Sequence, residues 1–151
     1  MVEEGDIVED FEVLDQHGEP IALSSLLETG PVVLFFYPRA MTTGCTKESC
    51  HFRDLAGEFE SVGASPVGVS ADPVERQREF DDRNELGFPL LSDSDRELAR
   101  RFGVKRLGPL PNKRATFVIG SDRRVLRVIR SELNMDSHAD EALSILRQRI
   151  S

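Results

Sequence analysis

The sequence is poor in cysteine and histidine, and it has no long run of apolar residues. A chain of 151 residues can bury a full core without disulfide or metal support, so two cysteines need not be structural. The longest apolar run is far shorter than a membrane-spanning helix. Residues 1–11 are acidic and lack the apolar segment of a secretory signal. We therefore expect a cytoplasmic protein that makes no membrane contact.

Basic residues are also in deficit, with 19 lysines and arginines against 27 acidic residues and a net charge of −8. Such a surface repels phosphate groups, so we expect neither a nucleic acid nor an anionic membrane as a partner. The apolar share of 39% is that of an ordinary globular protein. No repeat, low-complexity tract or long linker divides the chain. We therefore predict a single domain over residues 1–151.

The two cysteines, Cys45 and Cys50, are separated by four residues. This is not the C-x2-C spacing of a zinc knuckle or of a thioredoxin-type redox motif. A metal site would need further ligands, and of the three histidines only His51 is adjacent to a cysteine. We expect no bound metal and no cofactor.

Both cysteines follow a segment that predicts a buried strand. Residues 32–37 form an unbroken β-branched and aromatic run, which is typical of a strand covered on both faces, and Pro38 ends it. A helix follows, with Thr42 or Thr43 as its N-cap. Cys45 then lies near the first turn, at the positive end of the helix dipole, where a thiol loses its proton most readily. The three- and four-residue spacing that predicts this helix is that of Phe52, Leu55, Ala56, Phe59 and Val62.

The remaining pattern predicts an α/β fold, a mixed β-sheet flanked by helices, with a β-hairpin near the N-terminus. Asp72 and Pro73 are expected to begin one helix, as its N-cap and first residue. Ser94 and Glu97 form a capping-box pattern for another. The predicted strands are residues 11–14, 21–23, 64–70, 88–91, 115–119 and 125–129, and the predicted further helices are 24–27, 72–86, 94–102 and a C-terminal one.

Pro38, Thr42 and Cys45 form the pattern P-x3-T-x2-C, whose members suit the reduction of a peroxide. A Cys45 thiolate can attack one peroxide oxygen and become a sulfenic acid. The Thr42 hydroxyl can bind the thiolate and the peroxide, and Pro38 can exclude water. Backbone N–H groups at the helix start can stabilise the leaving oxygen. Arg114 precedes the strand at 115–119, at a sheet end from which it could reach the thiol.

These motifs resemble peroxiredoxins of the bacterioferritin comigratory protein, or peroxiredoxin Q, type over nearly the whole chain. The matching segments are DFEVLDQHGE, LFFYPRAMTTGCTKESCHFRD, GVSAD, FPLLSD, FGV and KRATFVI. The resemblance implies a thioredoxin-like fold, with Cys45 as the peroxidatic cysteine and Cys50 as the resolving cysteine. It also implies that Arg114 activates the thiol, that Glu48 orients this arginine, and that Pro38 and Thr42 line the pocket.

The resemblance further implies peroxide substrates, both hydrogen peroxide and organic hydroperoxides, and recycling by thioredoxin or a similar dithiol. It leaves open whether the protein is a monomer or a homodimer. The chain departs from the family at Thr43, where proline is common, and at Gly120, where an acidic residue is usual. We expect these departures to affect rate and stability rather than the chemistry.

The cysteine spacing predicts a change of structure on oxidation. Residues five apart on an ideal helix have Cα atoms about 8.6 Å apart, whereas a disulfide needs roughly 4.4–6.8 Å. A bond between Cys45 and Cys50 therefore requires the helix to unwind. We expect the segment from Thr43 to about Phe52 to be helical when reduced, and disordered or rebuilt when oxidised.

Simpler interpretations remain for each residue. Cys45 could be an inert buried thiol, and Cys50 an ordinary helix residue in an enzyme resolved by an external thiol. Arg114 could be a surface residue of the basic loop before it, and His138 a helix residue without catalytic duty. The alternative functions are a thiol–disulfide oxidoreductase and a redox-switch binding module.

Overall fold

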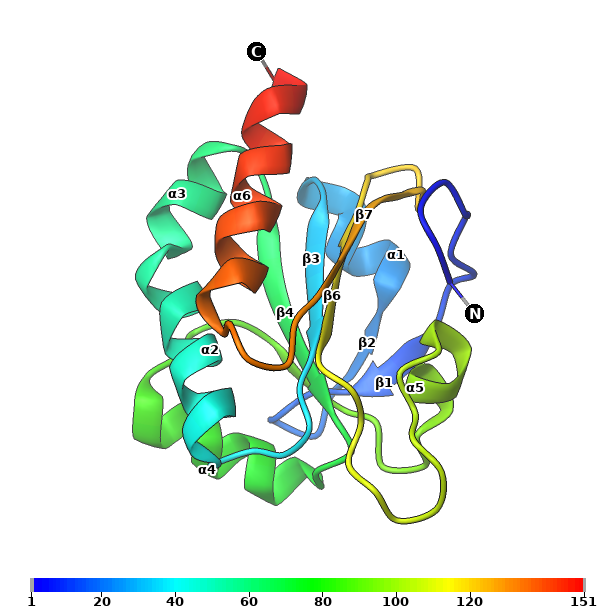
Figure 1. The fold of residues 1–151 in the computed structure, drawn as a ribbon, viewed down its shortest axis with the longest axis vertical. Helices are drawn as coiled ribbons and strands as arrows, with labels where there is room; N and C mark the ends of the chain where they lie inside the picture. Colours follow the sequence, from blue (N-terminus) through cyan, green and yellow to red (C-terminus); the bar gives the residue numbers. More distant parts are fainter. Residues whose placement is uncertain (1, 151) are drawn as a thin grey trace.

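The structure is a computed structural model that describes residues 2–150, without the side chain of Ile150. Its centre is a five-stranded sheet in the order β5-β4-β3-β6-β7 (Figure 1). A two-stranded antiparallel hairpin near the N-terminus pairs β1 with β2. The strands are β1 (Glu12–Leu14), β2 (Pro20–Ala22), β3 (Val32–Phe36), β4 (Ser65–Ser70), β5 (Leu90–Ser92), β6 (Ala115–Ile119) and β7 (Val125–Arg130).

The sheet is mixed, as the sequence predicted. Strand β3 is parallel to β4 and antiparallel to β6, while β4–β5 is parallel and β6–β7 antiparallel. All five residues of β3 are buried. Because successive side chains of a strand point to opposite faces, β3 contributes to two separate cores. Its residues 32, 34 and 36 join one core, and residues 33 and 35 join the other.

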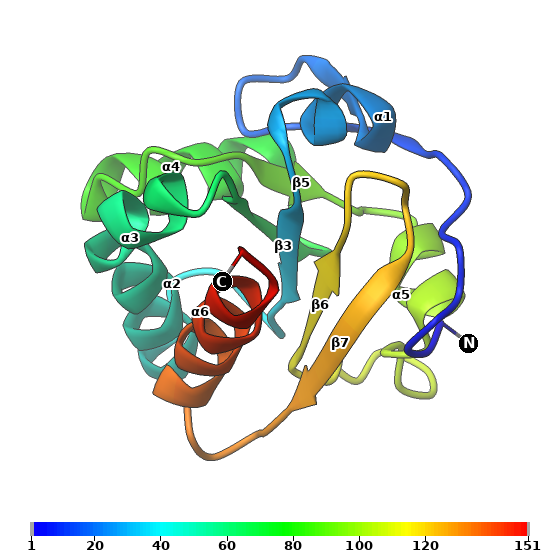
Figure 2. The same cartoon turned by 90° about the horizontal axis from the view of Figure 1, so that it is seen from above.

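Helices cover both faces of the sheet (Figure 2). One face carries α2 (Thr43–Asp54), α3 (Ala56–Ser61), α4 (Val74–Asn84) and α6 (Asp136–Ile150). The other face is covered by α1 (Leu23–Leu26), the 3-10 turn η1 (Leu27–Thr29) and α5 (Glu97–Phe102). None of the helices in the described part is long and apolar enough to cross a membrane.

Local details of three helices differ from the prediction. The helix after Cys45 is not continuous, because Leu55 leaves helical geometry between α2 and α3. Pro73, not Asp72, is the N-cap of α4. The Asp72 carboxylate is used elsewhere, since it accepts hydrogen bonds from the Ala40 N–H at 2.7 Å and the Ser70 hydroxyl at 2.6 Å. Asp72 thereby ties the loop after β3 to the end of β4.

The capping box expected from Ser94 and Glu97 is also wrong. The N-cap of α5 is Arg96, in a left-handed conformation with φ of 59°. The buried carboxylate of Asp93 accepts the N–H groups of Leu98 and Ala99 at 3.0 and 2.9 Å. A side chain outside the expected motif therefore satisfies the first N–H groups of this helix.

Candidate active site

Cys45 lies in the first turn of α2, immediately beyond the loop that follows β3. Thr42 is the N-cap, with extended backbone angles of −83° and 157°. The Cys45 side chain is fully buried, and both cysteines are free. A sulfur at this place is close to the unpaired N–H groups of the helix start, which favour negative charge.

Arg114 connects Cys45 to Glu48. Its Nη2 lies 3.3 Å from the Cys45 sulfur, and its Nη1 donates to Oε1 of Glu48 at 2.6 Å. Only 6% of its side chain is exposed, so Arg114 is not a surface arginine. The backbone N–H of Arg114 donates to Glu132 at 2.8 Å, which fixes the residue from the other side.

The fold explains why these three residues meet. Cys45 and Glu48 are three positions apart in α2 and therefore share one face of the helix. Arg114 directly precedes β6, whose first residue, Ala115, pairs with Phe36 at the end of β3. The backbone of Arg114 therefore lies beside the loop that leads into α2. Gly44 leaves room for it, since a Cβ there would lie 3.3 Å from Nη2.

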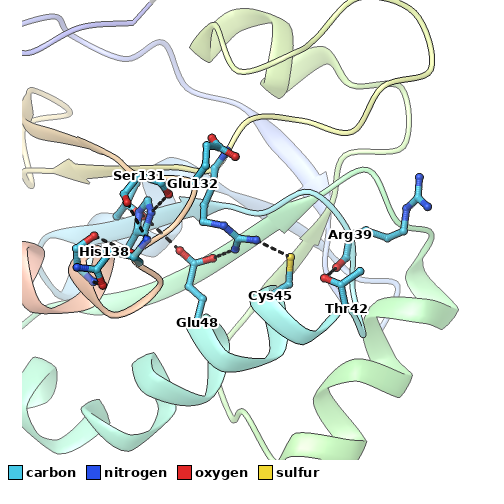
Figure 3. Close-up of polar contacts among 11 residues, drawn as sticks. Arg39, Thr42, Cys45, Glu48, Ser131, Glu132 and His138 are labelled. Carbon is cyan, nitrogen blue, oxygen red and sulfur yellow. Dashed lines mark hydrogen bonds and ion pairs between the residues drawn. The ribbon is translucent and has the colours of Figure 1, made fainter.

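His138, for which the simpler interpretation was a helix residue without catalytic duty, belongs to the same cluster (Figure 3). It is fully buried in α6, with Nδ1 2.8 Å from the Thr116 hydroxyl and Nε2 2.8 Å from the Ser131 carbonyl. Its Nδ1 lies 3.6 Å from Oε2 of Glu48. One sequence signal could have shown its burial: His138 is four positions before Ala142, on the apolar face of the last helix.

Burial is the largest single influence on the pKa values of Glu48, His138 and Arg114. It raises the pKa of Glu48 to about 8, although Arg114 acts in the opposite direction. It also lowers the pKa of His138, helped by the positive charge of Arg114. For Arg114 itself burial lowers the pKa, but the negative charges of Glu48 and Cys45 outweigh burial and the pKa is raised. Arg114 is therefore the permanent charge around which the other groups titrate.

Cys50 has different surroundings, five residues or about 1.4 turns further along α2. Its side chain is partly exposed, and its sulfur is 3.7 Å from Oδ1 of Asn84 in α4. Directly after it, His51 pairs with Asp140 of α6 at 2.7 Å. Phe52 then enters the core and stacks on Phe35 with ring centroids 4.2 Å apart.

Thr42 and Pro38 belong to the loop that leads from β3 into α2. The Thr42 hydroxyl donates to the Arg39 carbonyl at 2.9 Å, so it does not make the expected hydrogen bond to the sulfur (Figure 3). Pro38 is partly buried and lines a hollow of about 210 Å³ together with residues that include Arg39, Asp72 and Asn112. Pro38 thus faces an open space on one side of the loop that carries the cysteine.

The side chains give no sign of a metal centre in residues 2–150. No group of three or more histidine, cysteine, aspartate and glutamate side chains is placed there to hold a metal ion. Glu48 and His138 lie close together, but Oε1 of Glu48 is already paired with the Arg114 guanidinium and is not free to bind a metal ion.

Comparisons with known proteins agree on one group of relatives. Residues 5–128 match the AhpC/TSA family. The crystal structure of peroxidoxin BcpB from Mycobacterium tuberculosis is similar, with 57% identity, a TM-score of 0.95 and coverage of 98% of each chain. The chloroplastic peroxiredoxin Q of Sedum lineare is 38% identical over 138 residues, which are 90% of this chain and 73% of that protein.

A bacterioferritin comigratory protein from Xanthomonas campestris, described for its alkyl peroxide reduction activity, is also similar. It has 30% identity and a TM-score of 0.84, over 93% of this chain and 92% of that one. The likeness over the full sheet and its helices confirms the predicted thioredoxin-like fold.

Proposed function

The chain belongs to the AhpC/TSA family and is a thiol-dependent peroxidase of the peroxiredoxin type, and we propose that Cys45 is its attacking thiolate. The contact of Arg114 with both Cys45 and Glu48 carries this proposal. A guanidinium 3.3 Å from the sulfur stabilises a thiolate before any substrate arrives. Cys50 has no comparable positive partner at its sulfur among the hydrogen bonds of the described residues.

In the proposed reaction, the Cys45 thiolate attacks one oxygen of the peroxide. The S–O bond forms as the O–O bond breaks, the sulfur is oxidised by two electrons, and the leaving oxygen takes up a proton. Arg114 and the N–H groups at the start of α2 stabilise the negative charge on that leaving oxygen. Pro38 keeps water from the site. Thr42 turns its hydroxyl from the Arg39 carbonyl towards the bound peroxide.

We propose that Cys50 then attacks the sulfenic sulfur and releases water, which leaves a disulfide. The two residues lie five positions apart in α2, so the first turns of this helix must unwind. Phe52 limits this change, because its ring is fully buried between Phe35 and Phe59. Unwinding should therefore extend from Thr43 to Cys50 or His51 and stop at Phe52.

Amide hydrogen exchange of the reduced and oxidised protein tests the unwinding. Exchange should accelerate on oxidation across residues 43–51, while the amides of Phe59 in α3 and of β3 stay protected. Equal exchange across residues 43–51 in the two states would exclude an internal disulfide of this kind.

The family implies peroxide substrates and a thiol reductant. For this protein we propose hydrogen peroxide and organic hydroperoxides as substrates, in line with the alkyl peroxide reduction of the Xanthomonas relative. We further propose thioredoxin or a similar dithiol as the reductant, and a single domain over residues 1–151 that acts in the cytoplasm as a monomer or homodimer. The acidic charge gives no reason to expect nucleic acid or membrane partners.

Neither alternative function is favoured. A thiol–disulfide oxidoreductase would need the C-x2-C motif that is missing here, and the similar proteins are peroxiredoxins. The same relatives count against a redox-switch module without turnover.

Mass spectrometry of the protein and of its Cys45→Ser and Cys50→Ser variants after one equivalent of hydrogen peroxide tests the cysteine roles. The parent should lose about two daltons as its disulfide forms, and a trappable sulfenic acid should accumulate only in Cys50→Ser. If Cys45→Ser is oxidised as fast as the parent, the assignment of the attacking thiol is wrong.

A further inference from the structure

Within residues 2–150, one oxygen of the buried Glu48 carboxyl has no hydrogen-bond partner. Oε1 is held by Arg114, whereas Oε2 accepts no hydrogen bond although the whole side chain is fully buried. Leaving a charged oxygen in this condition is costly. Nδ1 of His138 lies 3.6 Å from Oε2, too far for a hydrogen bond but close enough for charge on either group to act on the other. A proton on either group would therefore reduce the cost.

The His138 ring is held in one orientation with its titratable nitrogen towards Glu48. Nε2 faces the Ser131 carbonyl at 2.8 Å, and because a carbonyl only accepts, Nε2 carries a hydrogen. Nδ1 faces the Thr116 hydroxyl at 2.8 Å and lies on the side of Glu48. Any additional proton therefore goes to Nδ1 or to Oε2 of Glu48.

The charged groups that act on the Glu48–His138 pair are one cation, Arg114, and two acidic residues, Glu132 and Glu141. Arg114 faces both Glu48 and Cys45 from the residue before β6. Glu132, which precedes α6, acts on both Glu48 and His138, and Glu141 of α6 acts on His138. These acidic groups and the burial of Glu48 favour retention of a proton in the pair, whereas the burial of His138 and the charge of Arg114 oppose it.

We propose that Glu48 and His138 together hold one proton, and that this proton balances the charge of the Cys45 thiolate across Arg114. The inference rests on the proposed role of Cys45 as the attacking thiol. With the proton on the pair, the positive charge of Arg114 is available to the thiolate. Without it, the Glu48 carboxylate and the thiolate compete for one guanidinium. His138 is in this sense a positioning residue that acts on the thiol through Glu48 and Arg114.

The proton count of the oxidation step follows from this arrangement. Formation of a neutral sulfenic acid from the thiolate consumes one proton, which the leaving oxygen takes. Once the sulfur is neutral, the pair loses its proton and Glu48 alone balances Arg114. The proton consumed and the proton released match, so the buried cluster is neutral before and after the reaction.

The first test compares thiolate formation in a double-mutant cycle built on Cys50→Ser, so that only Cys45 is observed. His138→Phe should move the midpoint of the thiolate absorbance upward by about one pH unit, which is roughly a tenfold loss of thiolate below the midpoint. The same substitution in a Glu48→Gln background should have no such effect, because glutamine already lacks the negative charge.

His51→Phe is the matched control, since His51 also joins α2 to α6 but pairs with Asp140 rather than Glu48. It should leave the thiolate midpoint unchanged. An absent shift in His138→Phe, or an equal shift in the parent and Glu48→Gln backgrounds, would overturn the inference, because His138 would then act through packing alone.

The second test needs no change at position 138 and counts protons with a pH indicator as the Cys50→Ser protein is oxidised by hydrogen peroxide. Net proton uptake should be close to zero when Glu48 is present, and about one per thiolate in the Glu48→Gln variant. Uptake of about one proton in both would show that the pair releases none on oxidation, and would overturn the inference. The thiolate titration requires no peroxide, so a failure of Cys45 to react with peroxide refutes the proposed function separately.

Discussion

Cys45 and Cys50 lie five residues apart in one helix, yet their surroundings are opposite in kind. The Cys45 sulfur is fully buried and lies 3.3 Å from the Arg114 guanidinium, which Glu48 holds, while Glu132 holds the Arg114 backbone N–H. The Cys50 side chain is partly exposed, and its one hydrogen bond is a long contact of 3.7 Å to Asn84.

The difference matches two chemical needs. A thiol that must react first with peroxide needs fixed positive charge before the substrate arrives, since charge that is already in place costs no reorganisation. A thiol that must reach a partner sulfur needs weak attachments that break easily. The start of α2 is connected to β6 and α6 by buried polar contacts, while the turn that carries Cys50 has the partly exposed His51–Asp140 pair and the long Asn84 contact before Phe52 enters the core.

Removal of the Arg114 guanidinium should have the largest effect on the difference in reactivity between Cys45 and Cys50. Arg114→Gln should slow the reaction of Cys45 with hydrogen peroxide by roughly 10²–10³-fold, the usual loss when one preorganised donor is removed. Rapid-quench mass spectrometry of the sulfenic acid in a Cys50→Ser background measures this rate. Arg106→Gln is the control, because Arg106 belongs to the same loop but pairs with the exposed part of Glu132. A comparable loss in both variants would contradict a specific role for Arg114.

The buried carboxyl should make stability depend on pH. The unfolded chain loses the Glu48 proton near pH 4.5, whereas burial raises the folded pKa to about 8. The folded state therefore binds more protons over this interval, and the free energy of unfolding falls as pH rises through it, by at most about 1.4 kcal/mol per pH unit.

In the parent protein, whose Cys45 thiolate favours the protonated pair, Glu48→Gln should reduce this fall between pH 5 and pH 8. Denaturant unfolding at several pH values measures how the free energy of unfolding changes with pH. Glu79→Gln, at an exposed carboxylate paired with Arg83, should leave the slope unchanged. A Glu48→Gln protein with the slope of its parent would show that Glu48 is ionised throughout.

The smallest effect is expected at Cys50. Asn84→Ala removes the contact to the Cys50 sulfur but keeps the backbone carbonyl that accepts from Arg53 at 2.6 Å. Disulfide formation should be unchanged or faster by a few-fold, with a stability cost of about 1 kcal/mol for the lost side-chain hydrogen bonds. Rapid-quench mass spectrometry gives the rate. A marked slowing would mean that Asn84 guides Cys50 instead of restraining it.

Local patterns were sufficient to predict the strand–loop–helix unit around Cys45. The apolar run of β3, the proline after it and the threonine N-cap are short-range signals, and the structure has all three in the predicted places. The helix starts were less predictable. Asp72 accepts from the Ala40 N–H instead of capping α4, and Asp93, which lies outside the expected Ser94–Glu97 motif, accepts from the first N–H groups of α5.

Short-range patterns are enough to predict the order of the strands and helices and the position of Cys45 at a helix N-terminus, since these depend on neighbours within a few residues. The rest of the cluster depends on long-range contacts. Arg114 and Glu48 are 66 positions apart and meet because β6 pairs with β3. His138 reaches Glu48 because α6 packs beside α2 on the same face of the sheet. Such contacts follow from strand register and helix packing, which no local spacing in the sequence encodes.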